Sequence, residues 1–245
     1  MNALSVKNIT KSFSKDDKDL AVLSDISFSV EPGQVLAILG KSGSGKTTLL
    51  NIISKLEVPT SGSVEYQEGV SYMPQKDLLL PWRNTLNNVL LPFEIQKSLS
   101  KENKTNIDTL LNELELSEFK EAYPSELSGG MRQKVSLVRS LAQDKPLYIF
   151  DESLSAIDFD SRLKLIKKIR NYLVQNKKIG IFVTHNIEEA ISVADKIIVF
   201  SPRPAKIIYE TTVNISDDSR DPVEIRKSPE FQNQFDSLWK IMAKA

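Results

Sequence analysis

The chain has 245 residues, with 32 basic (Lys and Arg) and 32 acidic residues, so its overall charge gives no general attraction to nucleic acid or to an anionic membrane. It contains no cysteine, which excludes disulfide bonds and thiolate metal sites. No apolar run approaches the length that crosses a bilayer, and the opening residues lack the pattern of a signal peptide, so any role at a membrane is expected to depend on a partner protein.

Several segments within residues 1–73 alternate apolar and polar residues. The pattern is clearest in "LSVKNITKSF" and "AVLSDISFSV", and it returns in "SGSVEYQ" and "VSYMPQ". Such alternation is typical of antiparallel strands with one exposed face. We therefore expect these segments to add an antiparallel β layer beside the core of the protein.

The core itself is predicted from short, continuous apolar runs that stand between helical patterns. Runs rich in Ile, Val and Phe are typical of strands buried on both faces, as in a parallel sheet covered by helices. Alternation of such strands with helices favours a wound α/β fold. The predicted strands cover 35–39, 146–150, 179–184 and 196–200, and the predicted helices cover 47–56, 131–143 and 161–176.

A helical lobe and a helical tail are predicted around this core. Residues 77–127 are polar and helix-prone, and Pro81, Pro92 and Pro124 punctuate them. From about residue 211 the chain is charged, and it ends in a segment with an amphipathic pattern. We expect one domain over 1–245, in which 1–76 and 145–210 form the α/β core with its β layer, 77–144 a helical lobe and 211–245 a helical tail.

The stretch "GKSGSGKT" at 40–47 follows a predicted strand and opens a predicted helix. It satisfies the spacing G-x-x-x-x-G-K-[ST], in which glycines let the backbone wrap a phosphate chain, Lys46 neutralises phosphate charge and Thr47 ligates Mg²⁺. A glycine-rich turn with an exposed lysine does not require this full spacing. The motif therefore predicts a P-loop NTPase core that binds the phosphate chain of a nucleotide and Mg²⁺. The residues expected to hold the nucleotide are Gly40, Ser42, Gly43, Ser44, Gly45, Lys46, Thr47 and Thr48.

A second anion-binding pattern, "ELSGGMRQK", stands at 126–134. Ser128, Gly129 and Gly130 directly precede a helical pattern, so free backbone N–H groups and the positive end of a helix dipole are available to an anion. Taken alone, the pattern is better explained as an ordinary helix N-cap.

Three titratable residues follow predicted buried strands. Asp151 and Glu152 end "LYIFDE", and His185, the only histidine of the chain, ends "IGIFVTH". Because active groups gather at the carboxyl ends of parallel strands, we expect Asp151 in the Mg²⁺ site, Glu152 as the general base for water and His185 at the γ-phosphate. The alternatives are a charge pair at a strand end and a packed structural histidine.

Six elements follow one another in the order 40–47, "MPQ" with Gln75, "LSGGM" at 127–131, "LYIFDE" at 147–152, "SAID" at 155–158 and His185. This set resembles the ATP-binding subunit of ABC transporters. The resemblance implies that Gln75 contacts Mg²⁺ or the lytic water, so that Thr47, Gln75 and Asp151 are the metal residues. It also implies that Asp158 faces a second subunit and that Phe13 stacks on adenine. The alternative for Phe13 is a strand residue of the β layer.

The same resemblance implies that two identical chains face each other head to tail. The P-loop of one chain and Ser128, Gly129 and Gly130 of the other then close on one ATP. The implied partners are the second copy, integral membrane permease subunits and, through them, a solute-binding protein, at the cytoplasmic face of the cell membrane and without nucleic acid. The residues expected to act in catalysis are Lys46, Gln75, Glu152 and His185.

Three positions depart from the family pattern. Met131 stands where the signature segment usually has Gln, Ser153 where Pro is frequent and Ile157 where Leu is common. None of them is a group expected to act in the chemistry, so we expect the phosphate-binding function to persist.

Two further stretches resemble the nitrate, sulfonate and taurine importer branch, which also serves pyrimidine precursors of thiamine. They are "LLLPWRNTLNNVLLP" at 78–92 and "SPRPAKI" at 201–207. The resemblance implies that the first helps to form a groove for a permease helix, whereas "SPRP" is expected to be a tight turn without a chemical role. The candidate anchors of the groove are Leu79, Leu80, Pro81, Trp82 and Phe93, with packing of the lobe as the alternative for Leu80 and Trp82.

Two other functions compete with import. A soluble ABC-type ATPase that is not coupled to transport would share the same motifs, but translation types usually join two cassettes and repair types insert long coiled coils, and neither pattern is present. A small-molecule P-loop kinase would not need "LSGG" or the aligned His185.

Overall fold

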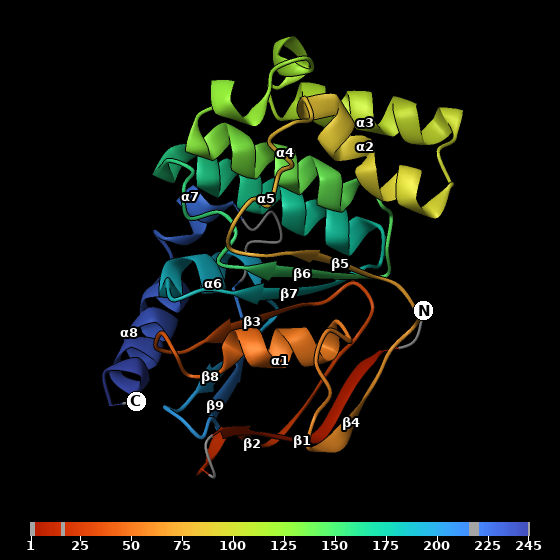
Figure 1. Cartoon of the computed structure of the whole chain (residues 1–245). Coiled ribbons are helices and arrows are strands. Elements are labelled where there is room, and N and C mark those ends of the chain that lie inside the picture. The colour runs from red at the N-terminus through yellow and green to blue at the C-terminus, as the bar shows by residue number, and fades with distance from the viewer. Residues whose placement is uncertain (1–2, 16–17, 216–220, 245) are drawn as a thin grey trace.

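The computed structural model describes residues 3–15, 18–215 and 221–244, which form a larger and a smaller β-sheet with helices around them (Figure 1). The larger sheet has the strand order β5-β6-β7-β3-β8-β9. Its strands run parallel to one another except β9, which pairs antiparallel with β8. The strands are β3 (Val35–Leu39), β5 (Val70–Met73), β6 (Leu147–Asp151), β7 (Ile179–Val183), β8 (Lys196–Phe200) and β9 (Ile207–Thr212).

The predicted α/β core is confirmed, because the continuous apolar runs form the central strands. Every residue of β3, β6 and β7 is buried, as expected for strands that are covered on both faces. The helices of the core are α1 (Lys46–Ile53), α4 (Gly129–Leu141), α5 (Phe159–Gln175) and α6 (Ile187–Val193).

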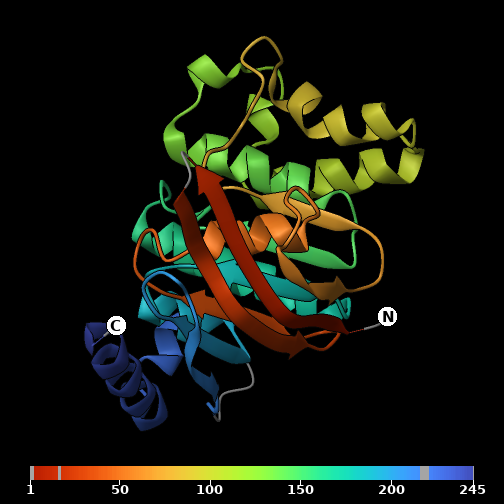
Figure 2. The same cartoon turned by 60° about the horizontal axis from the view of Figure 1, so that its bottom comes forward.

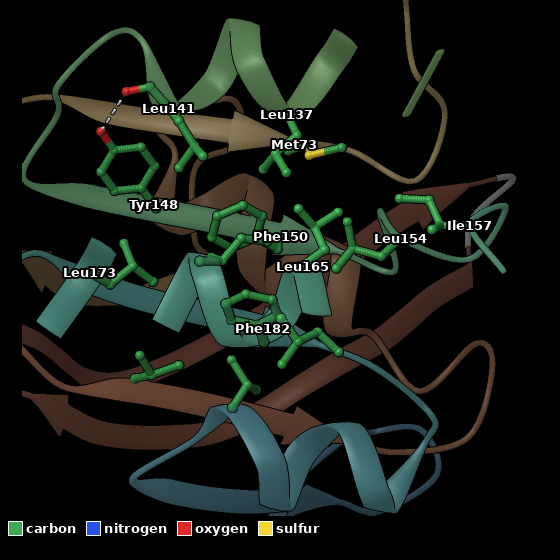
Figure 3. Packing of buried hydrophobic residues seen from close by; sticks show 14 of the residues in the cluster. Met73, Leu137, Leu141, Tyr148, Phe150, Leu154, Ile157, Leu165, Leu173 and Phe182 are labelled. Carbon is green, nitrogen blue, oxygen red and sulfur yellow. Dashed lines mark hydrogen bonds between the residues drawn. The ribbon is translucent and has the colours of Figure 1, made fainter. Parts of the chain in front are cut away.

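The two faces of the larger sheet are covered by different layers. Side chains that alternate along the strands belong to separate clusters, one shared with α4, α5 and α6 and the other with α1 and the smaller sheet. Figure 3 shows the first cluster, in which Phe150 of β6 and Phe182 of β7 face the apolar side chains of α4 and α5. Their rings stack with centroids 4.4 Å apart, so β6 is tightly packed just before the residues that are expected to act in chemistry.

The smaller sheet is antiparallel, as predicted, with the order β2-β1-β4. It is formed by β1 (Leu4–Lys15), β2 (Lys18–Val30) and β4 (Ser61–Glu65). The expectation that "VSYM" also joins this layer is wrong, because β5 pairs parallel with β6 in the larger sheet. As an edge strand with one half-exposed face, β5 alternates in burial and so has the pattern of an antiparallel strand.

The lobe lies at one end of the molecule, where α2 (Thr85–Gln96) and α3 (Lys101–Glu113) stand beside α4 (Figures 1 and 2). Two short 3₁₀ turns, Ser117–Phe119 and Pro124–Glu126, connect α3 to α4. Pro92, one of the three prolines that punctuate the predicted lobe, lies inside α2. The proline removes one backbone hydrogen bond, and packing of Val89 and Phe93 into the core holds the helix around it.

The tail consists of α7 (Pro222–Ile225) and α8 (Pro229–Lys244), and α8 lies along α6. Because β9 extends to Thr212, the first two residues assigned to the tail are strand. Residues 216–220 and 245, which the predicted tail includes, lie outside the described residues, as do residues 1–2 and 16–17 of the predicted β layer. Among the helices that the structure describes, none has the length and apolarity needed to cross a membrane.

Candidate functional site

The P-loop joins the end of β3 to the start of α1. Gly43 and Gly45 have φ angles of 79° and 105°, in the left-handed region that glycine adopts without strain. A Cβ atom on Gly45 would lie 3.0 Å from Val22 Cγ1, so the loop is packed against β2 as well. The Lys46 ammonium donates to the carbonyl oxygens of Gly40 at 2.8 Å and Lys41 at 3.0 Å. The lysine is therefore folded over the loop, where phosphate oxygens would replace these carbonyls.

Oxygen ligands suited to a hard cation lie beside this loop. Thr47 Oγ1 donates to Asp151 Oδ2 at 2.9 Å, and the Tyr72 hydroxyl donates to the same oxygen at 3.3 Å. Burial raises the pKa of the Asp151 carboxyl, although the hydrogen bonds from Thr47 and Tyr72 act in the opposite direction. A bound cation would compensate this buried carboxylate.

The chemistry of these ligands selects the kind of cation. A hydroxyl and a carboxylate oxygen fit Mg²⁺, which usually keeps part of its shell for phosphates and water. Within residues 3–15, 18–215 and 221–244, there is no group of three or more His, Asp or Glu side chains arranged for a metal. The Thr47 hydroxyl and the Asp151 carboxylate fit Mg²⁺ that arrives with a polyphosphate.

The Glu152 carboxylate lies between the Lys46 ammonium and the His185 imidazole. Its φ angle is 47°, an uncommon conformation for a residue other than glycine, and its N–H donates to Val183 O at 3.0 Å. Glu152 Oε1 lies 4.0 Å from Lys46 Nζ, and Oε2 lies 3.5 Å from His185 Nδ1. The carboxyl ends of β3, β6 and β7 thus bring Lys46, Glu152 and His185 to one edge of the sheet.

A polar cavity of about 330 Å³ opens above the P-loop. Ser44 and Gly40 support the loop from behind, since Ser44 is buried and a Cβ on Gly40 would lie 3.0 Å from its Oγ. His185, whose side chain is 70% exposed, does not line this cavity and reaches it only beside Glu152. The lining residues are Phe13, Leu20, Val22, Ser42, Gly43, Gly45, Lys46, Thr47, Thr48, Gln75, Asp151, Glu152 and Arg203.

Phe13 stands at the rim of the cavity and belongs to β1. Its ring is 38% exposed, and the Lys11 ammonium lies 4.7 Å from the ring centroid. A rigid aromatic ring at a cavity rim is suited to stacking on a planar base. Both sequence interpretations of Phe13 are thus compatible with its place, and its contact with adenine stays a prediction.

The signature segment lies apart from the cavity in the same chain. Ser128 is the exposed N-cap of α4, and its Oγ accepts a hydrogen bond from the Met131 N–H at 3.2 Å. A Cβ on Gly130 would approach Ala156 O to 3.3 Å, so this helix start lies against the "SAID" loop. Ser128, Gly129 and Gly130 are absent from the cavity lining.

Asp158 is placed with the signature segment rather than with the P-loop. It caps the start of α5, where its carboxylate accepts a hydrogen bond from the Ser161 N–H at 3.0 Å. This hydrogen bond holds the pKa of Asp158 below its usual range. The structure therefore divides the predicted residues into two groups, one around Lys46 and one around Ser128.

Three residues near these groups were not singled out by the sequence analysis. Tyr72 donates to Asp151, as described above, and Gln133 Oε1 accepts the Ala156 N–H at 2.8 Å. Arg203 Nε donates to the Gly43 carbonyl, whereas its "SPRP" segment was expected to have no chemical role. Only Gln133 had a local signal, since it follows the signature segment by two residues; Tyr72 and Arg203 become visible only when distant segments meet.

A family model described as "ABC transporter" matches residues 23–155. The uncharacterized ABC transporter ATP-binding protein YtlC of Bacillus subtilis is 37% identical over 98% of this chain and 95% of YtlC. The taurine import ATP-binding protein TauB of Jannaschia sp. is 33% identical over 94% of this chain and 90% of TauB. Other similar proteins carry the names of import ATP-binding proteins for formylaminopyrimidine, aliphatic sulfonates and nitrate.

A solved structure shares the fold. It is the dimeric post-hydrolysis state of the ATP-binding cassette MJ0796 bound to ADP and Pi, with a TM-score of 0.76 and 27% sequence identity. The match covers 86% of this chain and 99% of that chain. The predicted fold class is thereby confirmed.

The buried Asp151 carboxylate leads to a prediction about the nucleotide-free chain. Because burial raises the pKa of Asp151, the folded chain keeps a proton on this group to higher pH than the unfolded chain does. The stability that this proton contributes is present in acid and lost as the pH rises through the folded-state pKa. Asp151→Asn is therefore expected to raise Tm near neutral pH in EDTA, and to lose this advantage in acid.

Thermal melting monitored by circular dichroism measures the effect, with Asp236→Asn as the matched control. Asp236 is exposed on α8, so its amide variant should melt like the wild type at both pH values. A Tm for Asp151→Asn that equals or falls below the wild-type value near neutral pH contradicts the prediction.

Proposed function

Because this chain belongs to the ABC transporter family and is an ATPase of that family, we propose that it is the ATP-binding subunit of an importer that works as a pair of identical chains. The observation that carries the proposal is the separation of its two phosphate-binding segments. The P-loop lines the cavity, whereas Ser128, Gly129 and Gly130 do not. One chain therefore holds a nucleotide with half of the expected donors.

A head-to-tail pair supplies the missing half. The exposed Ser128 hydroxyl and the N-terminus of the 13-residue helix α4 are suited to a phosphate, and in the pair they face the P-loop of the other chain. Hydrogen bonds to a charged group contribute about 1.5–3 kcal/mol each. Loss of the γ-phosphate after hydrolysis thus removes several such contacts and loosens the interface, which gives hydrolysis a mechanical consequence.

The residues around the cavity take the following roles in this proposal. Lys46 and the P-loop N–H groups hold the phosphates. Thr47, Asp151 and Gln75 would hold Mg²⁺, which would supply positive charge against the charge that develops on the phosphate. Glu152 accepts a proton from the attacking water. His185 lies beside Glu152 at the edge of the cavity, and in this proposal it contacts the γ-phosphate there. Fixed donors of this kind stabilise transition-state charge without reorganisation.

Coupling to a permease is assigned to an apolar groove between the lobe and the core. The groove has a volume of about 610 Å³. Its largely exposed apolar residues are Leu56, Leu78 and Ile95. We assign it to a short cytoplasmic helix of the permease, which would anchor apolar side chains in it. The lining residues are Asn51, Leu56, Tyr72, Pro74, Leu78, Leu91, Pro92, Ile95, Gln96 and Arg139.

The structure corrects the anchors expected from sequence. Leu79 and Phe93 are buried in the core, so neither is available to a partner. Trp82 is 71% exposed and does not pack the lobe, but it does not line the groove either. Leu78, with a φ angle of 46°, lies just before the buried Leu79 and lines the groove. We therefore propose Leu78 as the anchor instead of Leu79.

The solute in this proposal is small and polar, such as a sulfonate, taurine, nitrate or a pyrimidine, as the names of similar importers suggest. A permease and a solute-binding protein would select it, because the ATPase does not contact the solute. The chain would then lie at the cytoplasmic face of the membrane through the permease. A soluble ABC-type ATPase is the alternative, and it is favoured if the chain fails to co-purify with membranes when its permease is co-expressed.

Removing the proposed base should trap the pair. Glu152→Gln keeps the size of the side chain but cannot accept a proton, so ATP hydrolysis should fall by about 100-fold or more while ATP still binds. In Mg²⁺ and ATP, size-exclusion chromatography with light scattering should show twice the monomer mass. The double variant Glu152→Gln, Ser128→Arg is the control and should stay monomeric; a monomeric Glu152→Gln in excess ATP would refute the shared site.

Blocking the signature segment should separate binding from hydrolysis. Ser128→Arg places a bulky side chain at the helix start that the other chain presents to ATP, so hydrolysis should fall by at least about 100-fold. Equilibrium binding of ATP to the isolated chain should change little, because Ser128 does not line that chain's cavity. A large loss of binding would instead place Ser128 in the site of its own chain.

A charge in the groove should uncouple the chain from its permease. Ile95 is 72% exposed in α2 and lines the groove, whereas Val174 is 40% exposed in α5 and does not. Ile95→Glu should abolish co-purification with the co-expressed permease, and Val174→Glu should retain it, with unchanged melting of both. Equal retention by the two variants would remove the groove as the docking site.

A further inference from the structure

The loop between β8 and β9, residues 201–206, is fixed in place rather than free. Its ends are closed by the Ser201 N–H, which donates to Lys206 O at 3.0 Å, and by the Lys206 N–H, which donates to Ser201 Oγ at 3.0 Å. Ala205 is fully buried. It exchanges backbone hydrogen bonds with β2, donating to Val22 O at 2.8 Å and accepting from the Ser24 N–H at 2.9 Å. The loop is therefore attached to the strand that carries Val22, a cavity residue.

Arg203 projects from this fixed loop to the P-loop. Its Nε donates to the Gly43 carbonyl, although 160 positions separate the two residues. A Cβ on Gly43 would lie 3.2 Å from Arg203 Nη2, so the guanidinium covers the outer tip of the P-loop closely. Arg203 also lines the cavity that contains Lys46 and Thr47.

The charge of Arg203 has no acidic partner in the described part of the chain, where no carboxylate lies within 4.0 Å of it. Lys46, the other cation of the cavity, is partly compensated by Glu152 and Asp151. A guanidinium carries five N–H donors in a planar fork that suits phosphate oxygens. With Nε engaged by Gly43, the remaining N–H groups are available at the rim of the cavity.

We propose that Arg203 is a nucleotide-binding residue, whose guanidinium contacts the phosphate chain of ATP while the Gly43 carbonyl orients it. The proposal rests on the proposed function, since it adds a contact to the same ATP site. It assigns a role to the loop after β8, which would form a third wall of that site beside the P-loop and the Phe13 rim. The contact is electrostatic, so its strength decreases with salt.

Three substitutions separate a charge contact from simple bracing of the P-loop. Arg203→Ala should weaken equilibrium ATP binding to the isolated chain by about 10- to 100-fold, the range expected for one hydrogen bond to a charged group. Arg203→Lys keeps the charge and should recover part of this loss. Arg203→Gln keeps a donor for the Gly43 carbonyl but no charge, so it should bind ATP as weakly as the alanine variant. Lys206→Ala removes an exposed cation of the same loop that does not line the cavity, and should bind like the wild type.

The measurement is titration with a fluorescent ATP analogue at low and high salt, with melting temperatures as the check on folding. The difference between wild type and Arg203→Ala should shrink at high salt. The proposal is overturned if Arg203→Ala binds within about twofold of the wild type, or if Arg203→Gln restores binding and Arg203→Lys does not. Failure of the wild type itself to bind ATP would refute the proposed function as well, so the two failures are distinguishable.

Discussion

The parallel register of β3, β6 and β7 is the constraint on which the site depends. Parallel pairing places the carboxyl ends of these strands at one edge of the sheet, and each end carries a group that chemistry at a phosphate requires: Lys46, Asp151 with Glu152, and His185. Beneath that edge, Phe150 of β6 stacks on Phe182 of β7 (Figure 3). This apolar packing supports the register in which the two strands are paired. The buried Asp151 carboxylate and the left-handed backbone of Glu152 are unfavourable features that this packing sustains, as is frequent at active sites.

The same constraint explains why one chain is an incomplete enzyme in the proposed mechanism. The sheet edge supplies the P-loop, the metal ligands and the base, but the donors at the start of α4 lie against the "SAID" loop. No local rearrangement of the P-loop moves Ser128 into the cavity, because α4 is packed through Val135 and Val138 into the common core. The nucleotide would therefore be part of the interface between two chains, and its γ-phosphate would decide whether that interface is closed.

Most of the fold and much of the site follow from sequence, for physical reasons that also mark the limits. Continuous apolar runs identified β3, β6, β7 and β8, since only strands covered on both faces need them, and the fixed spacing of 40–47 identified the P-loop. The placement of β5 failed because an edge strand alternates in burial like an antiparallel one. Leu79 was expected to be an exposed anchor but is buried, because Leu78 and Leu79 have the same chemistry and opposite exposure. The contacts of Tyr72 and Arg203 were not predictable, because they join positions 79 and 160 residues apart.

The segment from Tyr72 to Leu78 links the cavity to the groove by direct contacts. Tyr72 lines the groove, and its hydroxyl donates to the Asp151 carboxylate on the other side of the strand end. Farther along, Arg139 of α4 donates to the carbonyl oxygens of Asp77 at 2.7 Å and Leu78 at 3.0 Å, and Asp77 is also paired with Arg132 at 3.1 Å. A metal and nucleotide at Asp151 would compete with the Tyr72 hydrogen bond, while movement of α4 toward a second chain would pull on Asp77 and Leu78. Nucleotide state and groove shape would then influence each other reciprocally, which is the relation that an ATPase coupled to a permease requires.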